Sequence, residues 1–489
     1  MKDIKEVAFI GNYLTRQCGI ATLLLTICFS PSFGQQTWTR TYGGADSDVG
    51  FSAQQTMDGG YIIAGWTRSF GTGLGDVYLI KTDPWGDTLW TRTYGGPDEE
   101  VCYWVQQTAD SGYIVAGGTC SYGPGTPTSP NIYLVKTDAW GDTLWTRTYG
   151  GEGGDYANCV QQTPDGGYIV TGATESASIG NYDAFLIRTD ADGDTLWNRT
   201  YGGSSYDGGG YVQRTSDGGY VIAGSTQSFG PGTPSFLNVW LIKTNSAGDT
   251  LWTRAYGGEQ EDGGHSAQQT WDGGYIISGD TKSYGPGTPT YYNVYLLKTD
   301  GQGDTLWTRT YGGSRNDYGY CVRQTADSGY IMAGRFSTAT NAQAYLVKTD
   351  GNGDTLWTKT YGGTDADWAR SVRQAADGGY IIAGQTASYG AGGWDAYLIK
   401  TDAAGMAGVE GHPGASPPAR PPLWVRPNPF AAFATVPGRE TERFAVYDVS
   451  GRRVGEYYGA RIGNDLASGV YLLRPQGQNG PAARMVKLQ

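Results

Sequence analysis

The sequence contains few of the residues that most often carry catalysis or bind metals. Among 489 residues there are 2 histidines and 6 cysteines. It has no H-E-x-x-H zinc motif, no G-x-S-x-G nucleophile elbow and no P-loop. A Ser-His-Asp arrangement would have to use His265, and nothing near it in sequence supports one. We therefore expect a protein that is not an enzyme, with a hydrolase or lyase built on paired carboxylates as the enzymatic alternative.

Charged residues and long apolar runs are also scarce. Only 17% of the residues are charged, and the formal net charge is −12, which argues against a nucleic-acid partner because phosphate binding needs a basic surface. The apolar run from Cys18 to Phe29 is too short to span a bilayer, and no transmembrane segment is expected. Basic residues precede this run and Ser32-Phe33-Gly34 follows it, which predicts a signal peptide over residues 1–34.

Glycine and aromatic residues are abundant, and they recur in a repeat. The motif Trp-x-Arg/Lys-x-Tyr-Gly-Gly occurs seven times, and it starts at Trp38, Trp90, Trp145, Trp197, Trp252, Trp307 and Trp357. Each repeat contains four predicted strands, in the first repeat residues 50–56, 61–67, 77–82 and 88–94. Strand 61–67 is apolar on both faces, as expected where sheets stack face to face. The sequence therefore predicts an all-β, seven-bladed β-propeller of four-stranded blades over residues 35–402.

The two ends of the repeat region predict how the ring closes. Residues 36–42 form a strand with no repeat before it, and the last repeat lacks its fourth strand. We expect the N-terminal strand to complete the seventh blade, which removes two exposed sheet edges. An open solenoid has shorter coils and a string of modules needs linkers, so both alternatives fit less well. The units resemble the SBBP-type β-propeller repeats of bacterial secreted proteins, a resemblance that implies a fold but no ligand.

One loop in each repeat varies in length, the loop between the second and third strands. These loops are rich in Gly, Pro, Ser, Thr and aromatic residues, and they all emerge on one face of the disc. Loops on a rigid scaffold commonly carry binding sites, and aromatic side chains could stack on sugars or grip a peptide. The alternative is that they are turns without a ligand. The candidate binding residues are Tyr122, Phe229, Tyr284, Tyr291, Tyr292 and Trp394.

A carboxylate recurs at one position of every repeat, near the same face. The seven residues are Asp48, Glu100, Asp155, Asp207, Asp262, Asp317 and Asp367. They could hold Ca²⁺, which prefers oxygen ligands. The interpretation we favour is structural, with each carboxylate accepting backbone N–H bonds where the chain crosses between blades. We accordingly predict no cofactor, with calcium as the alternative.

The cysteines downstream of the predicted signal peptide are Cys102, Cys120, Cys159 and Cys321, and they lack C-x-x-C spacing. A zinc site is therefore not expected. Cys159 and Cys321 occupy the same place in two different repeats. We expect free, half-buried thiols.

The C-terminal part differs in composition from the repeats. Residues 403–423 are rich in Ala, Gly and Pro and predict a semi-rigid linker. Residues 424–489 predict a small Ig-like β-sandwich, with strands near 444–448, 453–458 and 470–474. This tail resembles the C-terminal sorting domain of type IX secretion substrates, and the matching segments are 427–430, 446–454, 468–474 and 485–488. An ordinary Ig-like adhesion domain is the alternative, and flagellar hook-capping proteins contain a similar module.

Together these features predict a secreted or cell-surface propeller. The resemblance of the tail implies the secretion machinery as one partner, with export across the outer membrane followed by surface attachment or release. The loop face predicts a second partner, an extracellular glycan or protein. The alternatives are a carboxylate-dependent enzyme acting on polysaccharide and a structural surface protein without a ligand.

Overall fold

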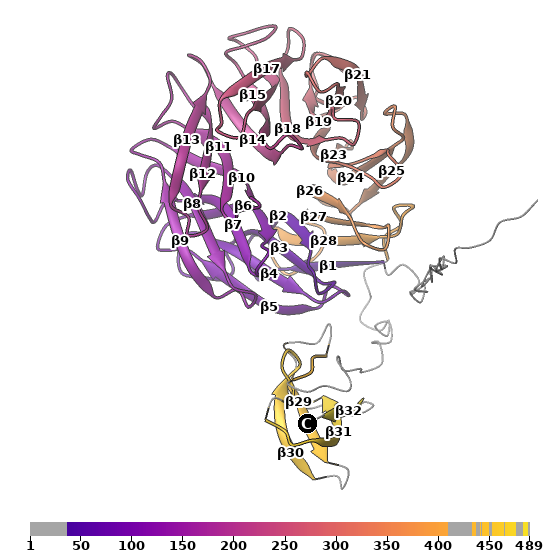
Figure 1. Ribbon diagram of the computed structural model, residues 1–489. Helices are drawn as coiled ribbons and strands as arrows, with labels where there is room; N and C mark the ends of the chain where they lie inside the picture. Colours follow the sequence, from indigo (N-terminus) through magenta and orange to yellow (C-terminus); the bar gives the residue numbers. More distant parts are fainter. Residues whose placement is uncertain are drawn as a thin grey trace, which may run out of the picture. The chain divides into compact units, whose positions relative to one another are not determined.

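The structure is a computed structural model that describes residues 37–408, 433–436, 441, 443–448, 452–463, 465–475 and 483–487. All regular elements in these ranges are strands, and the described residues contain no helix with the length and apolar character needed to cross a membrane. Seven four-stranded antiparallel sheets surround a common centre (Figure 1). This confirms the predicted seven-bladed β-propeller.

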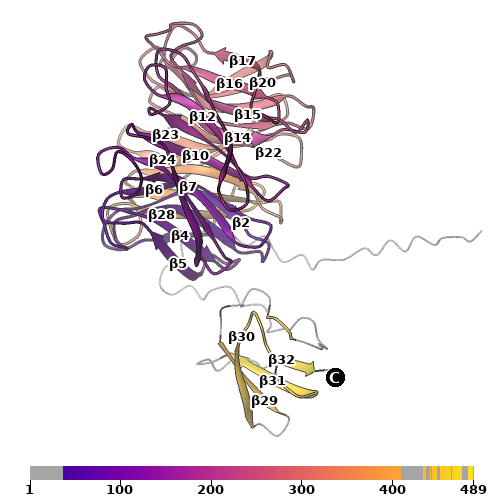
Figure 2. The same ribbon diagram turned by 60° about the vertical axis from the view of Figure 1, so that its left-hand side comes forward.

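Blades 1 to 6 run in sequence order from an inner strand to an outer strand, whereas the outer strand of blade 7 is β1. Figure 2 shows the sheets from a second direction. The strands of blades 1 to 4 are β2 (Asp48–Gln55), β3 (Tyr61–Thr67), β4 (Asp76–Thr82), β5 (Thr88–Tyr94); β6 (Glu100–Gln107), β7 (Tyr113–Thr119), β8 (Asn131–Thr137), β9 (Thr143–Tyr149); β10 (Asp155–Gln162), β11 (Tyr168–Thr174), β12 (Asp183–Thr189), β13 (Thr195–Tyr201); and β14 (Asp207–Arg214), β15 (Tyr220–Thr226), β16 (Asn238–Thr244), β17 (Thr250–Tyr256). Those of blades 5 to 7 are β18 (Asp262–Gln269), β19 (Tyr275–Thr281), β20 (Asn293–Thr299), β21 (Thr305–Tyr311); β22 (Tyr318–Gln324), β23 (Tyr330–Ser337), β24 (Ala342–Thr349), β25 (Thr355–Tyr361); and β26 (Asp367–Gln374), β27 (Tyr380–Thr386), β28 (Asp395–Thr401) with β1 (Trp38–Tyr42).

The N-terminal strand closes the ring, as predicted. β1 pairs antiparallel with β28, from Trp38 opposite Lys400 to Tyr42 opposite Ala396. The first strand of the chain is thus the outer strand of the last blade. The turn after β28 continues to Met406, whose backbone carbonyl accepts the Asp402 N–H at 3.0 Å.

The middle strands of each blade are buried on both faces because neighbouring blades stack against them. All residues of β4, β8 and β12 are buried, which explains their continuous apolar sequences. The outer strands, such as β5, alternate exposed and half-buried positions. One core cluster joins Ile62 and Leu79 of blade 1 to Cys102 and Val105 of blade 2.

The Trp-x-Arg-x-Tyr-Gly-Gly motif links each outer strand to the next blade. Trp38 of blade 7 packs edge-on against Tyr61 of blade 1, with ring centroids 5.6 Å apart. The Tyr42 hydroxyl donates to the Gly86 carbonyl at 2.7 Å. Gly86 has φ +80°, and a Cβ there would lie 2.7 Å from the Trp38 ring, so this turn requires glycine. The same tyrosine-to-glycine bond joins the remaining blades, at Tyr94–Gly141, Tyr149–Gly193, Tyr201–Gly248, Tyr256–Gly303, Tyr311–Gly353 and Tyr361–Gly405.

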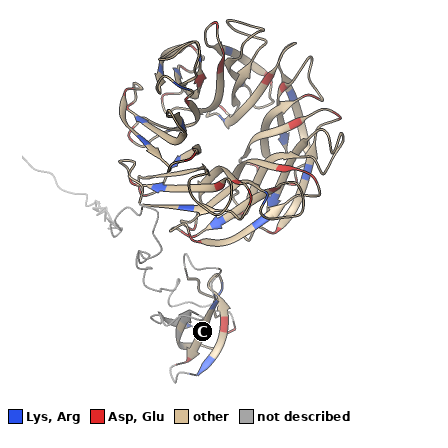
Figure 3. Ribbon diagram, turned by 180° about the vertical axis from the view of Figure 1, so that it is seen from behind, with Lys and Arg blue, Asp and Glu red and all other residues tan. Residues whose placement is uncertain are grey.

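Many charged residues of the blades form ion pairs, and Figure 3 shows both signs spread over the sheets. A buried cation at the end of each third strand pairs with an aspartate of the hairpin turn of the same blade, for example Lys81 with Asp58 at 2.8 Å. The other pairs of this kind are Lys136–Asp110, Arg188–Asp165, Lys243–Asp217, Lys298–Asp272, Lys348–Asp327 and Lys400–Asp377. We call these seven pairs the framework ion pairs.

The C-terminal part contains one four-stranded sheet in the order β30-β29-β31-β32. Its strands are β29 (Arg443–Asp448), β30 (Arg453–Tyr458), β31 (Gly469–Pro475) and β32 (Ala483–Lys487). Phe444 and Val446 lie in its core. A second facing sheet, which an Ig-like sandwich requires, stays a prediction. The predicted signal peptide, most of the predicted linker and the segment 427–430 lie outside the described residues.

Candidate binding site on the loop face

Three of the predicted binding residues hold their own loops against the scaffold. Tyr122 lies 5.9 Å from the ring of Tyr133, and its hydroxyl donates to the Gly95 carbonyl at 2.9 Å. Phe229 and Tyr284 pack in the same way, 5.6 Å from Trp240 and 5.8 Å from Tyr295. Rings occupy this place in three further blades, at Phe70, Phe336 and Tyr389. A ring repeated in six blades and packed on each is most simply a support for the loop, although each of the three candidates stays partly exposed.

The other candidates lie in a second environment, which blade 3 shares in part, because Tyr156 and Tyr182 occupy the positions of Trp368 and Trp394 there and lie 6.2 Å apart. Tyr292 lies 5.1 Å from the ring of Tyr318, and Trp394 lies 5.2 Å from that of Trp368. Arg335 lies between these two pairs, 4.7 Å from the centre of the Tyr318 ring and 4.9 Å from that of Trp368. Tyr291 precedes Tyr292 and is exposed.

A basic side chain also lies at the blade 5 end of this row. The Lys282 ammonium is 4.2 Å from the centre of the Tyr292 ring. Glu261 accepts hydrogen bonds from Lys282 at 3.1 Å and from the Tyr292 hydroxyl at 2.5 Å. The result is a continuous row of side chains across blades 5, 6 and 7, in which two aromatic residues follow each basic residue. We call it the loop-face row, and it consists of Lys282, Tyr292, Tyr318, Arg335, Trp368 and Trp394.

A second layer lies beneath this row on the inner strands. Arg370 of β26 lies 4.6 Å from the centres of the Trp368 and Tyr320 rings and 5.5 Å from that of Phe51. His265 of β18 lies 5.7 Å from the Tyr320 ring and contacts the carboxylate of Asp280. The layer therefore joins blades 5, 6, 7 and 1, and Arg370 connects it to the loop-face row.

The deepest layer brings together side chains from blades that are not neighbours. Trp104 of blade 2 lies 5.3 Å from Tyr211 of blade 4. Arg323 of blade 6 lies 4.8 Å from the Tyr211 ring, and Arg373 of blade 7 lies 5.4 Å from that of Trp104. Side chains therefore bridge the centre of the ring at this level.

Arg323 and Arg373 stand where the other five blades have glutamine. In those blades the glutamine Oε1 accepts a backbone N–H from the next blade, for example from Gln107 to Gln54 at 3.1 Å. The equivalent bonds are Gln162–Gln106, Arg214–Gln161, Gln269–Gln213 and Gln324–Gln268. An arginine has no acceptor to offer, so this series of bonds is interrupted at blades 6 and 7.

Burial and like charge act on these arginines. Burial lowers the pKa of Arg370, the nearby charge of Arg335 adds to this, and Tyr320 opposes it. Burial likewise lowers the pKa of Arg373, with a further contribution from Arg323. Burial raises the pKa of Tyr318 to about 12, although Arg335 opposes this shift. The tyrosines around Arg335 and Arg370 are therefore neutral hydroxyls at physiological pH.

The seven repeated carboxylates are fully buried and accept hydrogen bonds from their own surroundings. Asp207 accepts the Gly203 N–H at 2.8 Å and the Ser228 hydroxyl at 2.6 Å, and it also contacts the Thr226 hydroxyl. Glu100 is bound in the same manner by Gly96 and Thr119. In the part of the chain that the structure describes, no group of three or more His, Cys, Asp or Glu residues is arranged to hold a metal ion. The four cysteines there are free thiols, but only Cys120 is half-buried as predicted, because Cys102, Cys159 and Cys321 are buried between the blades.

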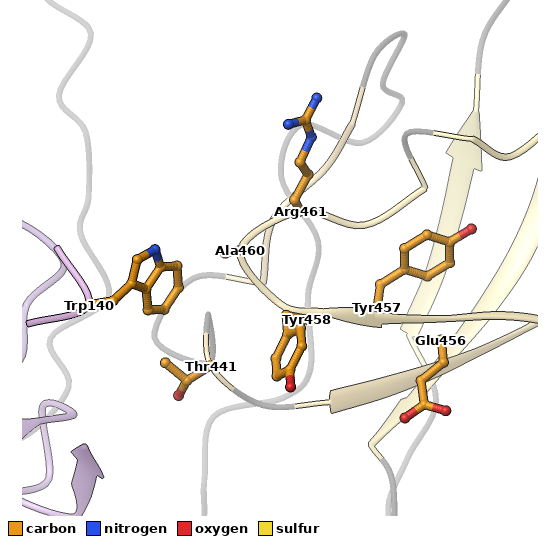
Figure 4. A pocket seen from close by; sticks show the side chains of 7 residues that line it. All are labelled: Trp140, Thr441, Glu456, Tyr457, Tyr458, Ala460 and Arg461. Carbon is orange, nitrogen blue, oxygen red and sulfur yellow. The ribbon is translucent and has the colours of Figure 1, made fainter. Parts of the chain in front are cut away.

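Two hollows lie away from the loop face. One, of about 400 Å³, lies on the opposite face of the propeller, where Gln54, Gln55 and Gln107 line it. On the C-terminal sheet, Glu456, Tyr457 and Tyr458 of β30 and Arg461 after it line a second hollow (Figure 4). Tyr457 donates to Asp465 at 2.5 Å. Arg461 lies 5.0 Å from the centre of the Phe433 ring.

The sequence interpretation missed most of this site because it followed residues that recur. Tyr318, Arg335, Trp368 and Arg370 occupy positions where the repeats disagree with one another. The position of Arg335 carries Trp66, Gly118, Ala173, Ser225, Asp280 and Gln385 in the other blades. A comparison of the repeats position by position on the inner strands would have identified these residues.

Comparisons with known proteins show no family. No family model matches the chain, and no curated protein matches it. Among solved structures it is similar to PorZ, described as a bacterial surface component of the type-IX secretion system of Porphyromonas gingivalis, with 12% identity and a TM-score of 0.42 over 92% of this chain and 60% of that one. It is also similar to a PL25 ulvan lyase, with 11% identity and a TM-score of 0.48 over 74% and 96% of the two chains. Sqt1 from Chaetomium thermophilum aligns with 10% identity and a TM-score of 0.42 over 71% of this chain and 82% of that chain. At these scores the likenesses carry no information about ligand or activity.

Proposed function

We propose that this protein is an exported or cell-surface β-propeller that binds an extracellular ligand through its loop face. The observation that supports this most directly is the loop-face row, because aromatic and basic residues gather there at positions the repeat does not require. All six of its side chains are half-buried, so each retains surface for contact. Aromatic rings with an apolar face and a polar edge suit sugars and peptides alike.

A glycan array probed with the purified full chain and with Trp368→Ala tests this proposal. Trp271→Ala is the matched control, because Trp271 is exposed in a hairpin turn of the opposite face. We expect specific binding by the parent and the control and loss of binding by Trp368→Ala. Equal binding by all three proteins would place the ligand elsewhere, and no binding by any would favour a protein partner or a purely structural role.

For export, we infer that residues 424–489 act as a type IX sorting domain. The support is the resemblance of the segments 446–454 and 468–474, which contain the end of β29, the start of β30 and most of β31. A chain truncated after residue 423, expressed in a bacterium with that secretion system, should accumulate in the periplasm, whereas the full chain reaches the surface or medium. Surface delivery of the truncated chain would contradict this role.

A second candidate function follows from His265. Its ring contacts the Asp280 carboxylate and faces Tyr320, which is an arrangement suited to a general base held by an acid. Arg370 lies 4.6 Å from the centre of the Tyr320 ring. A histidine held by an acid, with a tyrosine and an arginine nearby, fits β-elimination from a uronic acid. The ultraviolet absorbance of unsaturated products, measured with the parent and with His265→Ala, separates an enzyme from a binding protein.

A further inference from the structure

Four arginines of the loop-face row and of the layers beneath it differ from the cations of the framework ion pairs in having no acidic partner within ion-pair distance. Among the described residues, no carboxylate forms an ion pair with Arg323, Arg335, Arg370 or Arg373, whereas all seven cations of the framework ion pairs have one. A buried charge is costly unless an opposite charge or hydrogen bonds compensate it. Asp317 interacts electrostatically with Arg335, and Arg323 donates to the Ser266 hydroxyl at 3.0 Å and to the Val322 carbonyl at 2.6 Å. The protein therefore compensates the positive charge of this region only in part.

The hydrogen-bonding groups of these arginines point to the same conclusion. The Nε atoms of Arg335 and Arg370 are buried and have no acceptor among the described residues. Aromatic rings lie against both guanidinium groups, at 4.6 to 4.9 Å. Stacking on rings orients a guanidinium while leaving its in-plane N–H donors for a planar or tetrahedral anion.

We propose that the loop face binds an acidic glycan, whose carboxylate or sulfate groups contact Arg335 and Arg370 while its sugar rings lie on Trp368 and Trp394. This deepens the proposed function and rests on it. Arg323 and Arg373, in the deepest layer, add positive charge beneath these contacts. A net charge of −12 repels polyanions at long range, so a polyanion that binds this chain needs a local cationic site of this kind.

Paired probes that differ only in charge test the inference. We would measure binding of the full chain by calorimetry to polygalacturonate and its methyl ester, and to dextran sulfate and dextran. We expect one charged polymer to bind at least about tenfold more tightly than its neutral partner, and the affinity to fall as salt rises. Whether the carboxylate or the sulfate polymer binds identifies the anionic group.

Variants connect the charge preference to these residues. Arg370→Gln and, separately, Arg335→Gln should each weaken the charged polymer by about tenfold and leave any neutral binding unchanged. The matched control is Arg309→Gln, which removes an exposed outer-strand arginine paired with Asp354. Two arginine variants are used so that a failure of one to fold leaves the other as the test.

The outcomes separate this inference from the proposed function. Equal binding of charged and neutral polymers that Trp368→Ala abolishes would overturn the acidic ligand while supporting the binding face. Tighter binding of poly-glutamate than of either charged polysaccharide would overturn the glycan in favour of an acidic peptide. No binding of any probe would overturn both.

Discussion

Two sets of basic side chains in the same propeller have opposite surroundings. The framework ion pairs repeat in every blade, and each buried cation meets an aspartate, as Lys243 meets Asp217 at 2.8 Å. The arginines at the centre occur in blades 6 and 7, replace residues of other types and meet aromatic rings instead of acids. Residues that recur in every blade indicate what the blades need in order to stack. Residues that differ in blades 6 and 7 indicate a role that the other blades do not share.

The largest effect is expected from removing a part of the repeated framework. Deleting residues 37–42 takes away β1, the buried Trp38 and Tyr42 rings, and the ladder to β28. We expect the free energy of unfolding to fall by about 5 kcal/mol or more, since several hydrogen bonds and two buried rings are lost. Chemical denaturation measures this, with a deletion of equal length in the predicted linker as the control. An unchanged midpoint would show that the ring does not depend on this closure.

Breaking one framework ion pair should cost less. Asp217→Asn removes the acidic partner of the buried Lys243 and should destabilise the propeller at pH 7 by about 1–3 kcal/mol. Burial raises the pKa of Asp217, but hydrogen bonds from Lys243 and Thr215 outweigh it and lower the pKa to about 2.

The lowered pKa of Asp217 predicts how the contribution of this ion pair to the free energy of unfolding changes with pH. A carboxyl group whose folded pKa lies below its unfolded value of about 4 stabilises the fold above pH 4 and ceases to do so as the pH falls toward 2. The difference in unfolding free energy between Asp217→Asn and the parent should therefore shrink over this range. A difference that does not change with pH would mean that charge is not its cause.

Replacing Arg373 by the glutamine of the repeat should raise the stability of the propeller, whereas the preceding two changes lower it. Arg373→Gln supplies the Oε1 acceptor that blades 1 to 5 have, and by analogy with Gln54, which accepts the Gln107 N–H, we expect it to accept the Gln55 N–H. We expect stability to rise by about 0.5–1.5 kcal/mol and affinity for an acidic ligand to fall, as is common where a binding site departs from the most stable sequence. Thermal unfolding and binding measured on the same samples check this. A stability loss together with unchanged binding would make Arg373 structural.

The smallest effect concerns paired acids at the boundary of blades 3 and 4. Burial raises the pKa of Asp183, and the neighbouring Asp207 adds to this shift. A raised pKa means that the folded state loses stability as the pH rises through it, so Asp183→Asn should raise the Tm at pH 7 and have no effect well below the pKa. The equivalent residue is already asparagine at 131, 238 and 293, and Asn131→Asp is the reciprocal control, expected to lower the Tm.

The seven blades, their four strands and the closure by β1 follow from the sequence alone. Regular repeats fix the fold because each unit presents the same apolar faces and the same turn glycines to its neighbours, as the contact of Trp38 with Gly86 illustrates. The supporting role of Tyr122 and its equivalents was hidden, because an aromatic residue in a variable loop predicts exposure as readily as packing.

Only the tertiary structure placed Arg335, Trp368 and Arg370 side by side and showed that Trp104 meets Tyr211 across the centre. Arg335 comes from blade 6 and the other two from β26 of blade 7, so blade stacking brings them together, whereas Trp104 and Tyr211 come from blades that are not neighbours and meet only in the closed ring. The sequence by itself determined the scaffold, because local periodicity dictates strands and stacking. The site was decided by closure, because that step brings unrepeated residues from separate blades to a common centre without leaving any short-range pattern in the chain.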